Sequence, residues 1–463
     1  MGEKLTAVKS ERLVSLDVFR GITIAGMILV NHPGSWSNKY APLGHAEWHG
    51  WTPTDLVFPF FLFIVGVAMT FSFDRRLAQG QSRLRLFEQV VRRTLILYLI
   101  GLIMYGFPNW RLIWPYVLFI LGLVFLFADE PPLGWPQGDM ARARKIAGWT
   151  LLVGAVLYFI LDFRYFNESN LRVVGVLQRI ALCYFFASLV VMYSGVRGRA
   201  LWAAAFILGY WVIMKLVQPP AEYIEMIRAA ERALAENPDA WKTDATVALY
   251  RHSINVLHNR PSGLLPDWLD IKLLGLHLYR ERPDPEGLLS TLPAIGTTLL
   301  GVLTGNWLHT SRERNEKAAG LFWMANIALF VGICMDYWFP INKKIWTSSY
   351  VVFTAGMGLH FLAMCFWLID VKGYKKWSWP FSVFGTNAII VYFAAHLGSK
   401  MLGRWRIPLA EGGTTSAYSW LYQNLFATWA DPVNASLLFA ITYVLLWLLL
   451  LIPLYRKKIF VKI

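Results

Sequence analysis

The stretch GHAEWHGWTPTDLVFPFF places several titratable groups at the entrance to a long apolar run. His45, His49 and Asp55 are the groups that could do chemistry there. An imidazole titrates near neutral pH, so it is suited to act as a general base. Asp55 could orient that imidazole, or it could cap the helix that begins after the threonine-rich TPT turn. HAEWH is not the zinc-protease pattern HExxH, because Glu47 is in the wrong position, and we predict no metal site.

A structural interpretation of His45 also fits the residues. Trp48 and Trp51 lie close to it, and aromatic side chains gather at membrane–water interfaces. A histidine in such an aromatic belt needs no chemical role. The residues alone leave both interpretations open.

The elements that must position these groups are predicted to be transmembrane helices. Of the 463 residues, 56% are apolar and only 16% are charged, which favours an all-α polytopic membrane protein over a soluble enzyme. A helix needs about 20 apolar residues to cross a bilayer. On that basis we predict a bundle of about 12 transmembrane helices in one domain, 1–463. The predicted spans are 13–33, 54–73, 90–107, 111–128, 146–162, 173–194, 199–217, 288–308, 318–339, 346–369, 379–402 and 434–455.

The basic residues predict the orientation of this bundle. The net charge is +15, and the lysines and arginines fall in short clusters between apolar spans rather than in a nucleic-acid-binding motif. If the N-terminus is cytoplasmic, most of these clusters lie on the inner side, as the positive-inside rule requires. We therefore expect an integral membrane protein with both termini cytoplasmic, the bilayer as a partner and no nucleic acid.

One predicted extramembrane segment is long. Residues 218–287 contain AEYIEMIRAAERALAE, which has the pattern of an amphipathic helix, followed by turn-rich sequence. This large extracytoplasmic loop could be a cap that packs on the outer face, or a lid over a site. The sequence does not separate the two.

Several polar residues fall inside predicted spans, where they are costly. Arg179 lies in GVLQRIALCYF, and an arginine at that depth must face protein, water or a ligand. Asn387 and His396 lie in FGTNAIIVYFAAH, and Asn31 closes the first span. These residues predict a polar interior.

Motifs along nearly the whole chain carry a family resemblance. They are SLDVFRG, VNHPGSW, HAEWHGWTPTDLVFPFFLFIVGVAM, GVLQRIALCYF, DPEGLLSTLPAIGTTLLGVLTG, PINKKIWTSSYV, IDVKG, GTNAIIVYFAAH and YRKKIFVKI. In this order they resemble the transmembrane acetyltransferase domain of the heparan-α-glucosaminide N-acetyltransferase family. The resemblance implies a membrane enzyme that uses acetyl-CoA, without a metal, and that forms a homodimer. It also implies a family core of ten spans, to which 111–128 and 146–162 add an extra hairpin.

The resemblance assigns roles to individual residues. The active-site histidine of the family falls on His45, the asparagine near the acetyl group on Asn31, and a further site histidine on His396. The short form without a signal sequence is similar to bacterial members of an inner membrane. We therefore expect the acceptor to be glucosamine or a small glucosamine-containing sugar rather than heparan sulfate.

The chemistry of amine acetylation suggests roles for further residues. His45 would take the proton of the amine, and Asn31 would donate to the acetyl oxygen. Asp55 or Glu286 would orient His45 or bind sugar hydroxyls, although Glu286 could also be a turn residue. The other predicted substrate-binding residues are His49, Arg179 and Asn387.

The phosphates of CoA need cationic partners on the inner face. The candidates are Arg20, Arg93, Lys457 and Lys458. Each could instead be an ordinary positive-inside anchor, and Arg20 could form an ion pair with Asp17, three residues away on the same helix face.

Other functions and routes stay open at this point. The span count suits a sugar transporter or flippase, although the chain shows no repeated half. An O-acetyltransferase of a cell-envelope glycan would use the same chemistry on a hydroxyl. Within the acetyltransferase interpretation, transfer could be direct or could pass through an acetylated His45.

Overall fold

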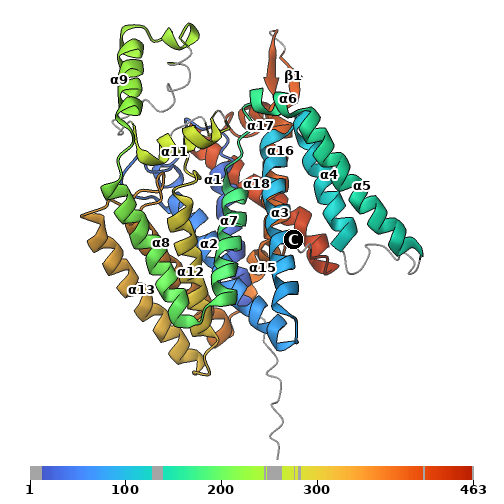
Figure 1. Ribbon diagram of the computed structural model, residues 1–463, viewed down its shortest axis with the longest axis vertical. Helices are drawn as coiled ribbons and strands as arrows, with labels where there is room; N and C mark the ends of the chain where they lie inside the picture. The colour runs from blue at the N-terminus through green and yellow to red at the C-terminus, as the bar shows by residue number, and fades with distance from the viewer. Residues whose placement is uncertain are drawn as a thin grey trace, which may run out of the picture.

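The computed structural model describes residues 13–127, 139–244, 247, 263–275, 277–279, 283–409 and 412–460. Long helices pack side by side in a bundle, and several of the short helices lie at one end of it (Figure 1). The helices of the first half are α1 Val14–Asn31, η1 Ala41–Leu43, α2 Pro53–Ala78, α3 Arg83–Gly106, α4 Trp110–Phe127, α5 Asp139–Leu161, α6 Phe163–Glu168, α7 Val176–Tyr193, α8 Val196–Leu216, α9 Ala221–Glu236 and η2 Ala240–Lys242. The elements of the second half are α11 Leu265–Leu274, α12 Thr291–Leu308, α13 Arg314–Asp336, α14 Ser348–Phe366, η3 Trp367–Val371, η4 Lys376–Ser378, α15 Trp379–Thr386, α16 Ala388–Arg404, β1 Arg406–Pro408, β2 Thr414–Ser416, α17 Ala417–Leu425 and α18 Pro432–Arg456.

Each of the twelve predicted spans coincides with a helical segment, which confirms the all-α architecture. Within the described residues, eight helices are long and apolar enough to cross a membrane, and the bent pair α15–α16 makes a ninth candidate. The predicted spans on α3, α4 and α12 fall outside that set. Helix α4 has too short an apolar stretch, α3 begins with charged residues, and α12 is rich in Thr and Gly. The number twelve therefore stays a prediction.

The centre of the bundle is formed by α1, α2, α7, α12 and α14, while less than a quarter of the membrane-length window of α5, α8, α13 and α18 is buried. Two glycines let α2 and α12 approach closely. A Cβ atom on Gly66 would lie 1.9 Å from the carbonyl oxygen of Thr298, and one on Gly301 would lie 2.1 Å from that of Phe63. Small residues at such crossings are typical of helix packing in membranes.

The start of α1 and the segment after α18 both bind the region around the α15–α16 break. The Arg20 guanidinium donates to the Gly385 carbonyl oxygen over 3.3 Å, and the Asn387 side chain donates to the Ile459 carbonyl oxygen over 3.1 Å. Asn387 lies at the break between α15 and α16, where the chain bends by 73°. The start of α1 and the end of α18 therefore share one side, and their cytoplasmic orientation stays a prediction.

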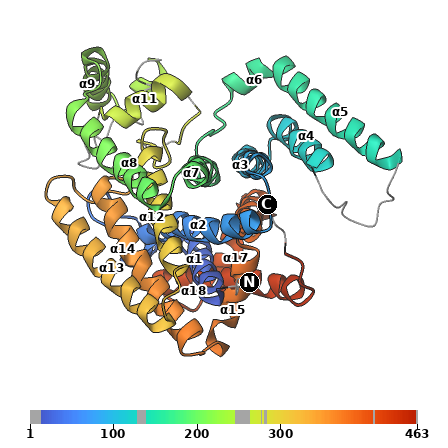
Figure 2. The same cartoon turned by 60° about the horizontal axis from the view of Figure 1, so that its bottom comes forward.

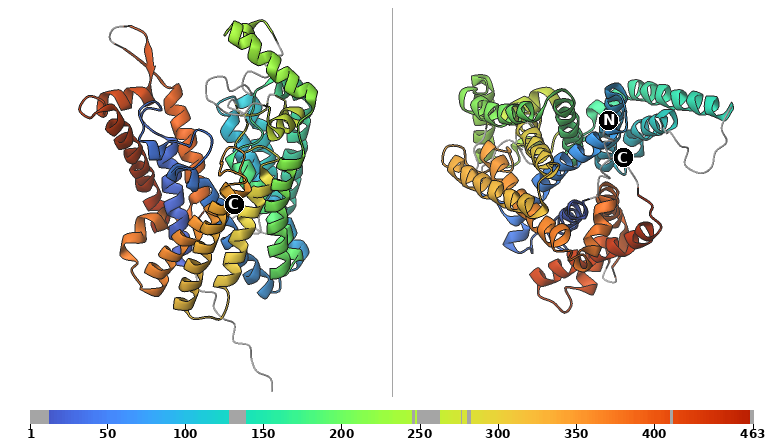
Figure 3. Two further views of the ribbon diagram at one scale, coloured as in Figure 1. Left: turned by 90° about the vertical axis from the view of Figure 1, so that its left-hand side faces the viewer. Right: turned by 90° about the horizontal axis from the view of Figure 1, so that it is seen from below.

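Two peripheral features stand apart from the centre. Helices α4 and α5 form a hairpin that projects sideways (Figures 2 and 3). Helix α9 rises from the bundle beside the short helix α11, and its bounds coincide with the predicted amphipathic helix (Figure 3). Its buried face carries Tyr223, Ile227 and Ala230. Most of the predicted turn-rich segment after η2 lies outside the described residues, so the choice between cap and lid stays open.

Candidate active site

A cavity of about 590 Å³ lies where α1 ends and α2 begins. It is lined from segments that are far apart in the sequence, including α3, α16 and the loops before α7, α12 and α14. Five of the predicted site residues line it, namely Asn31, His45, Asp55, Glu286 and His396.

His45 and Asp55 form the centre of this cavity. Nδ1 of His45 lies 2.7 Å from Oδ1 of Asp55. A carboxylate only accepts, so Nδ1 carries the proton and Nε2 keeps its lone pair. The Asp55 side chain is almost completely buried, whereas 48% of the His45 side chain is exposed. This arrangement orients the imidazole and leaves Nε2 as its basic nitrogen.

Asp55 is fixed by the start of α2. Its Oδ2 accepts from the backbone N–H groups of Ala46 and Thr52, each over 3.0 Å. Thr52 and Asp55 form a capping box, with Pro53 at the first helical position. The capping interpretation of Asp55 is therefore confirmed, and the same carboxylate also contacts His45.

Lys343 is a third member of this group that the sequence reasoning missed. Its Nζ lies 3.0 Å from Nδ1 and 3.2 Å from Nε2 of His45, and 3.5 Å from Oδ1 of Asp55. Burial lowers the pKa of Lys343, while the nearby carboxylates of Asp55 and Glu286 oppose that change. The signal for this lysine was the KK pair in PINKKIW at the outer end of a predicted span.

The surroundings also set the protonation state of His45. Burial lowers its pKa from the ordinary value near 6.5, the Asp55 carboxylate opposes this, and the charge of Lys343 adds to it. Glu286 acts on the imidazole more weakly, in the same direction as Asp55. The neutral form, which a general base requires, is favoured at neutral pH.

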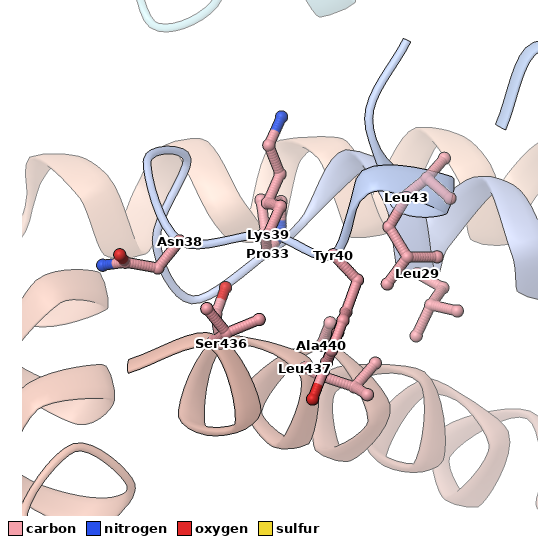
Figure 4. Close-up of a pocket in the computed structure, with 11 residues that line it drawn as sticks. Leu29, Pro33, Asn38, Lys39, Tyr40, Leu43, Ser436, Leu437 and Ala440 are labelled. Carbon is pink, nitrogen blue, oxygen red and sulfur yellow. The ribbon is translucent and has the colours of Figure 1, made fainter. Parts of the chain in front are cut away.

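The loop that carries His45 is anchored on α18 (Figure 4). The Gly34 N–H donates to the Ser436 carbonyl oxygen over 3.2 Å, and the Ser35 N–H donates to the Ser436 hydroxyl over 3.0 Å. Lys39 points away from α18, lines the cavity and lies over the ring of Trp36. The last helix of the chain thus supports the loop between the first two.

Glu286 is held by a network on the opposite wall. Arg172 donates to Glu286 over 2.5 Å and also binds the Asp284 carboxylate through two nitrogens. Its third nitrogen donates to the Tyr105 hydroxyl over 3.1 Å. Burial disfavours the charge of Glu286, but Arg172, Arg179 and Lys343 outweigh burial and lower its pKa. Glu286 is therefore a fixed carboxylate facing the cavity.

Arg179 does not line the cavity. Its buried guanidinium donates to the carbonyl oxygens of Pro285 and Gly287, each over 2.8 Å, and to the Ser290 hydroxyl. It also lies against the ring of Trp346, 5.1 Å from the centroid. We therefore assign it a positioning role, because it fixes the loop that carries Glu286.

Asn31 and His396 complete the inner wall. Asn31 is the last residue of α1, and its side chain makes no hydrogen bond with another described residue. The ring of His396 lies between those of His32 and Tyr105, at centroid distances of 6.3 and 6.4 Å. Asn31 can therefore donate to a bound substrate without breaking an existing bond.

The remaining predicted residues lie elsewhere. His49 stays on the exposed part of the loop and does not line the cavity, and Asn387 binds the backbone of the C-terminal segment. Arg20 pairs with Asp17 over 3.1 Å, as the ion-pair interpretation predicted. Arg20 and Asn31 are eleven positions apart on α1, so the two lie about 16 Å apart along the helix.

The other predicted phosphate-binding residues are also distant from the cavity. The Arg93 guanidinium lies over the ring of Tyr184, 4.8 Å from its centroid. Lys457 and Lys458 follow the end of α18 directly. Contact of Arg93 and of these two lysines with CoA stays a prediction.

The geometry suits proton abstraction next to a developing negative charge. An oriented imidazole, a lysine and an amide donor face one cavity from three different segments. Such a set can remove a proton from a nucleophile and stabilise an oxyanion, which are the two demands of acyl transfer.

Comparisons with known proteins agree with this chemistry. A family model described as "Heparan-alpha-glucosaminide N-acetyltransferase, catalytic" matches residues 12–107, which include His45, Asp55 and Asn31. The chain is 27% identical over 481 residues to "Heparan-alpha-glucosaminide N-acetyltransferase" of Homo sapiens, covering 98% of this chain. These findings support the heparan-α-glucosaminide N-acetyltransferase family for this chain.

A second relative gives the same result. The protein of the same name from Mus musculus is 26% identical over 479 residues and again covers 98% of this chain. The chain spans 60% and 61% of the lengths of these two relatives. The eight apolar helices of membrane length among the described residues, together with this similarity, support an integral membrane protein.

Proposed function

We propose that this protein transfers the acetyl group of acetyl-CoA to the amine of glucosamine or of a small glucosamine-containing sugar. The observation that carries the proposal is the 2.7 Å contact between His45 and Asp55 in a cavity that also contains Asn31 and Lys343. The names of the relatives support the same reaction type.

In the proposed reaction, His45 acts as the general base. The amine nitrogen attacks the thioester carbonyl carbon and gives a proton to Nε2 of His45. The C–S bond then breaks, the acetyl group stays on the nitrogen, and the leaving thiolate takes up a proton. Asp55 holds the Nδ1 proton in place throughout and stabilises the imidazolium.

Asn31 and Lys343 stabilise the oxyanion in this proposal. The Asn31 amide donates one hydrogen bond to the acetyl oxygen, and one such donor contributes about 3–4 kcal/mol to the transition state. The Lys343 ammonium lies 3.2 Å from Nε2 of His45, next to the position where the negative charge would develop. His396 and Glu286 bind the sugar from the remaining walls.

The acetyl donor is proposed to enter from the inner side. A narrow apolar pocket continues from the cavity along α1 and shares Met27, Val176 and Tyr392 with it. Ile24, one turn closer to the start of α1, also lines this pocket. The acyl arm would pass along this route, while Arg20, Arg93 and the two lysines after α18 bind the phosphates. We further propose a bacterial inner membrane, cytoplasmic termini and a homodimer.

Acetyl transfer by the purified protein tests the proposal. The protein is incubated with labelled acetyl-CoA and glucosamine, and both CoA release and N-acetylglucosamine are measured. We expect sugar-dependent CoA release that falls by about 10²–10⁴-fold in His45→Ala. His360→Ala is the matched control, because His360 lies on α14 and does not line the cavity.

Three results would contradict the proposal in different ways. A transporter would bind the sugar without releasing CoA. An O-acetyltransferase would give an ester that mild base removes. A folded His45→Ala protein with the full rate would refute the assignment of the base.

A further inference from the structure

A second cavity of about 520 Å³ lies beside the first. It is formed where α3 ends and α4 begins, together with α6 and the segment that leads to α7. These elements lie at the same end of the bundle, at the base of the α4–α5 hairpin (Figure 1). Its polar lining residues are Tyr105, Asn109, Tyr165, Ser169 and Asn170.

One aromatic residue connects the two cavities. Tyr105 lines both of them. Its hydroxyl accepts from Arg172, whose guanidinium also binds Glu286 on the wall of the first cavity. Its ring packs against Gly175, where a Cβ atom would lie only 2.4 Å from the ring. Tyr105 is therefore a fixed residue at the boundary that the two cavities share.

The two cavities differ in chemistry. The first contains lysines, an arginine and carboxylates, whereas none of the described residues that line the second is charged. In the second, the Asn109 amide donates to the Tyr165 hydroxyl over 2.8 Å. Amides and hydroxyls bind the hydroxyls of a sugar, and tyrosine rings cover its apolar C–H faces. Two arginines contact these tyrosines, Arg111 over the Tyr165 ring and Arg172 at the Tyr105 hydroxyl. Both already pair with carboxylates, Arg111 with Asp162 and Arg172 with Asp284 and Glu286, so they offer an acidic ligand no unpaired charge.

We propose that the second cavity binds the next sugar unit of the acceptor, and that this unit is neutral. The acceptor is then a disaccharide or longer chain, with its terminal amino sugar beside His45 and the following unit beyond Tyr105. This inference rests on the proposed function, because it assigns the substrate class of the same site.

The specificity of the enzyme tests this inference. Values of kcat/KM are compared for glucosamine, for glucosamine linked to N-acetylglucosamine, and for glucosamine linked to glucuronic acid. We expect the neutral disaccharide to be preferred over the monosaccharide by roughly tenfold, as two added hydrogen bonds allow, and over the acidic disaccharide as well. In the double variant Tyr165→Phe/Asn170→Ala, the preference over glucosamine should disappear while the rate with glucosamine stays within about twofold.

The matched control is Tyr337→Phe/Asn424→Ala, which removes the same groups from exposed positions outside both cavities. Equal values for monosaccharide and disaccharide, or equal losses for both in the cavity variant, would overturn the inference while leaving the proposed function intact. If neither sugar is acetylated, the proposed function fails. The affinity for the neutral disaccharide, measured by calorimetry, then still tests the second cavity. The protein should bind the disaccharide more tightly than glucosamine only when Tyr165 and Asn170 are present.

Discussion

Replacing Asp55 with asparagine separates the structural role of this carboxylate from its role beside His45. The substitution keeps the shape of the side chain but leaves one acceptor oxygen where there were two. That oxygen is expected to keep the bonds from the backbone N–H groups of Ala46 and Thr52. The amide nitrogen then faces Nδ1 of His45, where a carboxylate oxygen now accepts over 2.7 Å.

The substitution is expected to lower the activity much more than the stability of the protein. Two facing donors exclude each other, so Nδ1 must accept and the proton must move to Nε2. Nε2 then can no longer take a proton from the amine, and we expect kcat/KM to fall by about 10²–10⁴-fold, the usual contribution of a general base. The cap survives through one oxygen, so we expect the free energy of unfolding to fall by only about 1 kcal/mol.

The assay combines acetyl transfer with thermal unfolding of the purified protein. Asp431→Asn is the matched control, because Asp431 caps α18 by accepting from the N–H groups of Val433 and Asn434. It should cost a similar amount of stability without a comparable loss of activity. A folded Asp55→Asn protein that keeps at least a third of the wild-type kcat/KM would refute the assigned role of the His45–Asp55 pair.

Two further predictions concern His45 and Arg179. Because burial lowers the pKa of His45, its neutral form should persist as the pH falls to 6.5. Diethyl pyrocarbonate ethoxycarbonylates only the neutral imidazole, and mass spectrometry measures the rate of this modification at His45. The rate should reach half its maximum below pH 6.5. In Lys343→Met this midpoint should rise, and a wild-type midpoint at or above 6.5 would contradict the account. Arg179→Met leaves two loop carbonyls without their donor, so it should lower the free energy of unfolding by about 2–4 kcal/mol and raise the acceptor KM. Arg111→Met, which breaks an exposed ion pair, should leave the unfolding temperature unchanged, and equal behaviour of the two variants would contradict the positioning role.

The positions of the helices were largely predictable, because apolar runs of membrane length leave little choice to the chain. The helix over 221–236 was equally clear, since its apolar residues recur with helical spacing. The expected spans on α3, α4 and α12 are shorter or more polar than the others, and their residues already display this difference. The sequence showed no sign of the 73° bend at Asn387.

The candidate site was predictable only where residues lie close together in sequence or carry the family motifs. His45 and Asp55 are ten residues apart and start one helix, so their meeting follows from local geometry. Lys343 and Arg172 reach the cavity from loops far along the chain, and their contacts depend on how the helices pack. Arg179 was interpreted as a substrate contact because buried arginines need partners, but its partners are backbone carbonyls, which a sequence does not display.

The position of both substrates relative to His45 tests the central claim most directly. A structure of the protein with CoA and glucosamine bound should place the thiol sulfur and the sugar amine inside the cavity lined by Asn31, His45 and Lys343. The amine nitrogen should lie within about 3.5 Å of Nε2 of His45. A sulfur atom bound outside this cavity, with the imidazole in contact with neither substrate, would contradict the account.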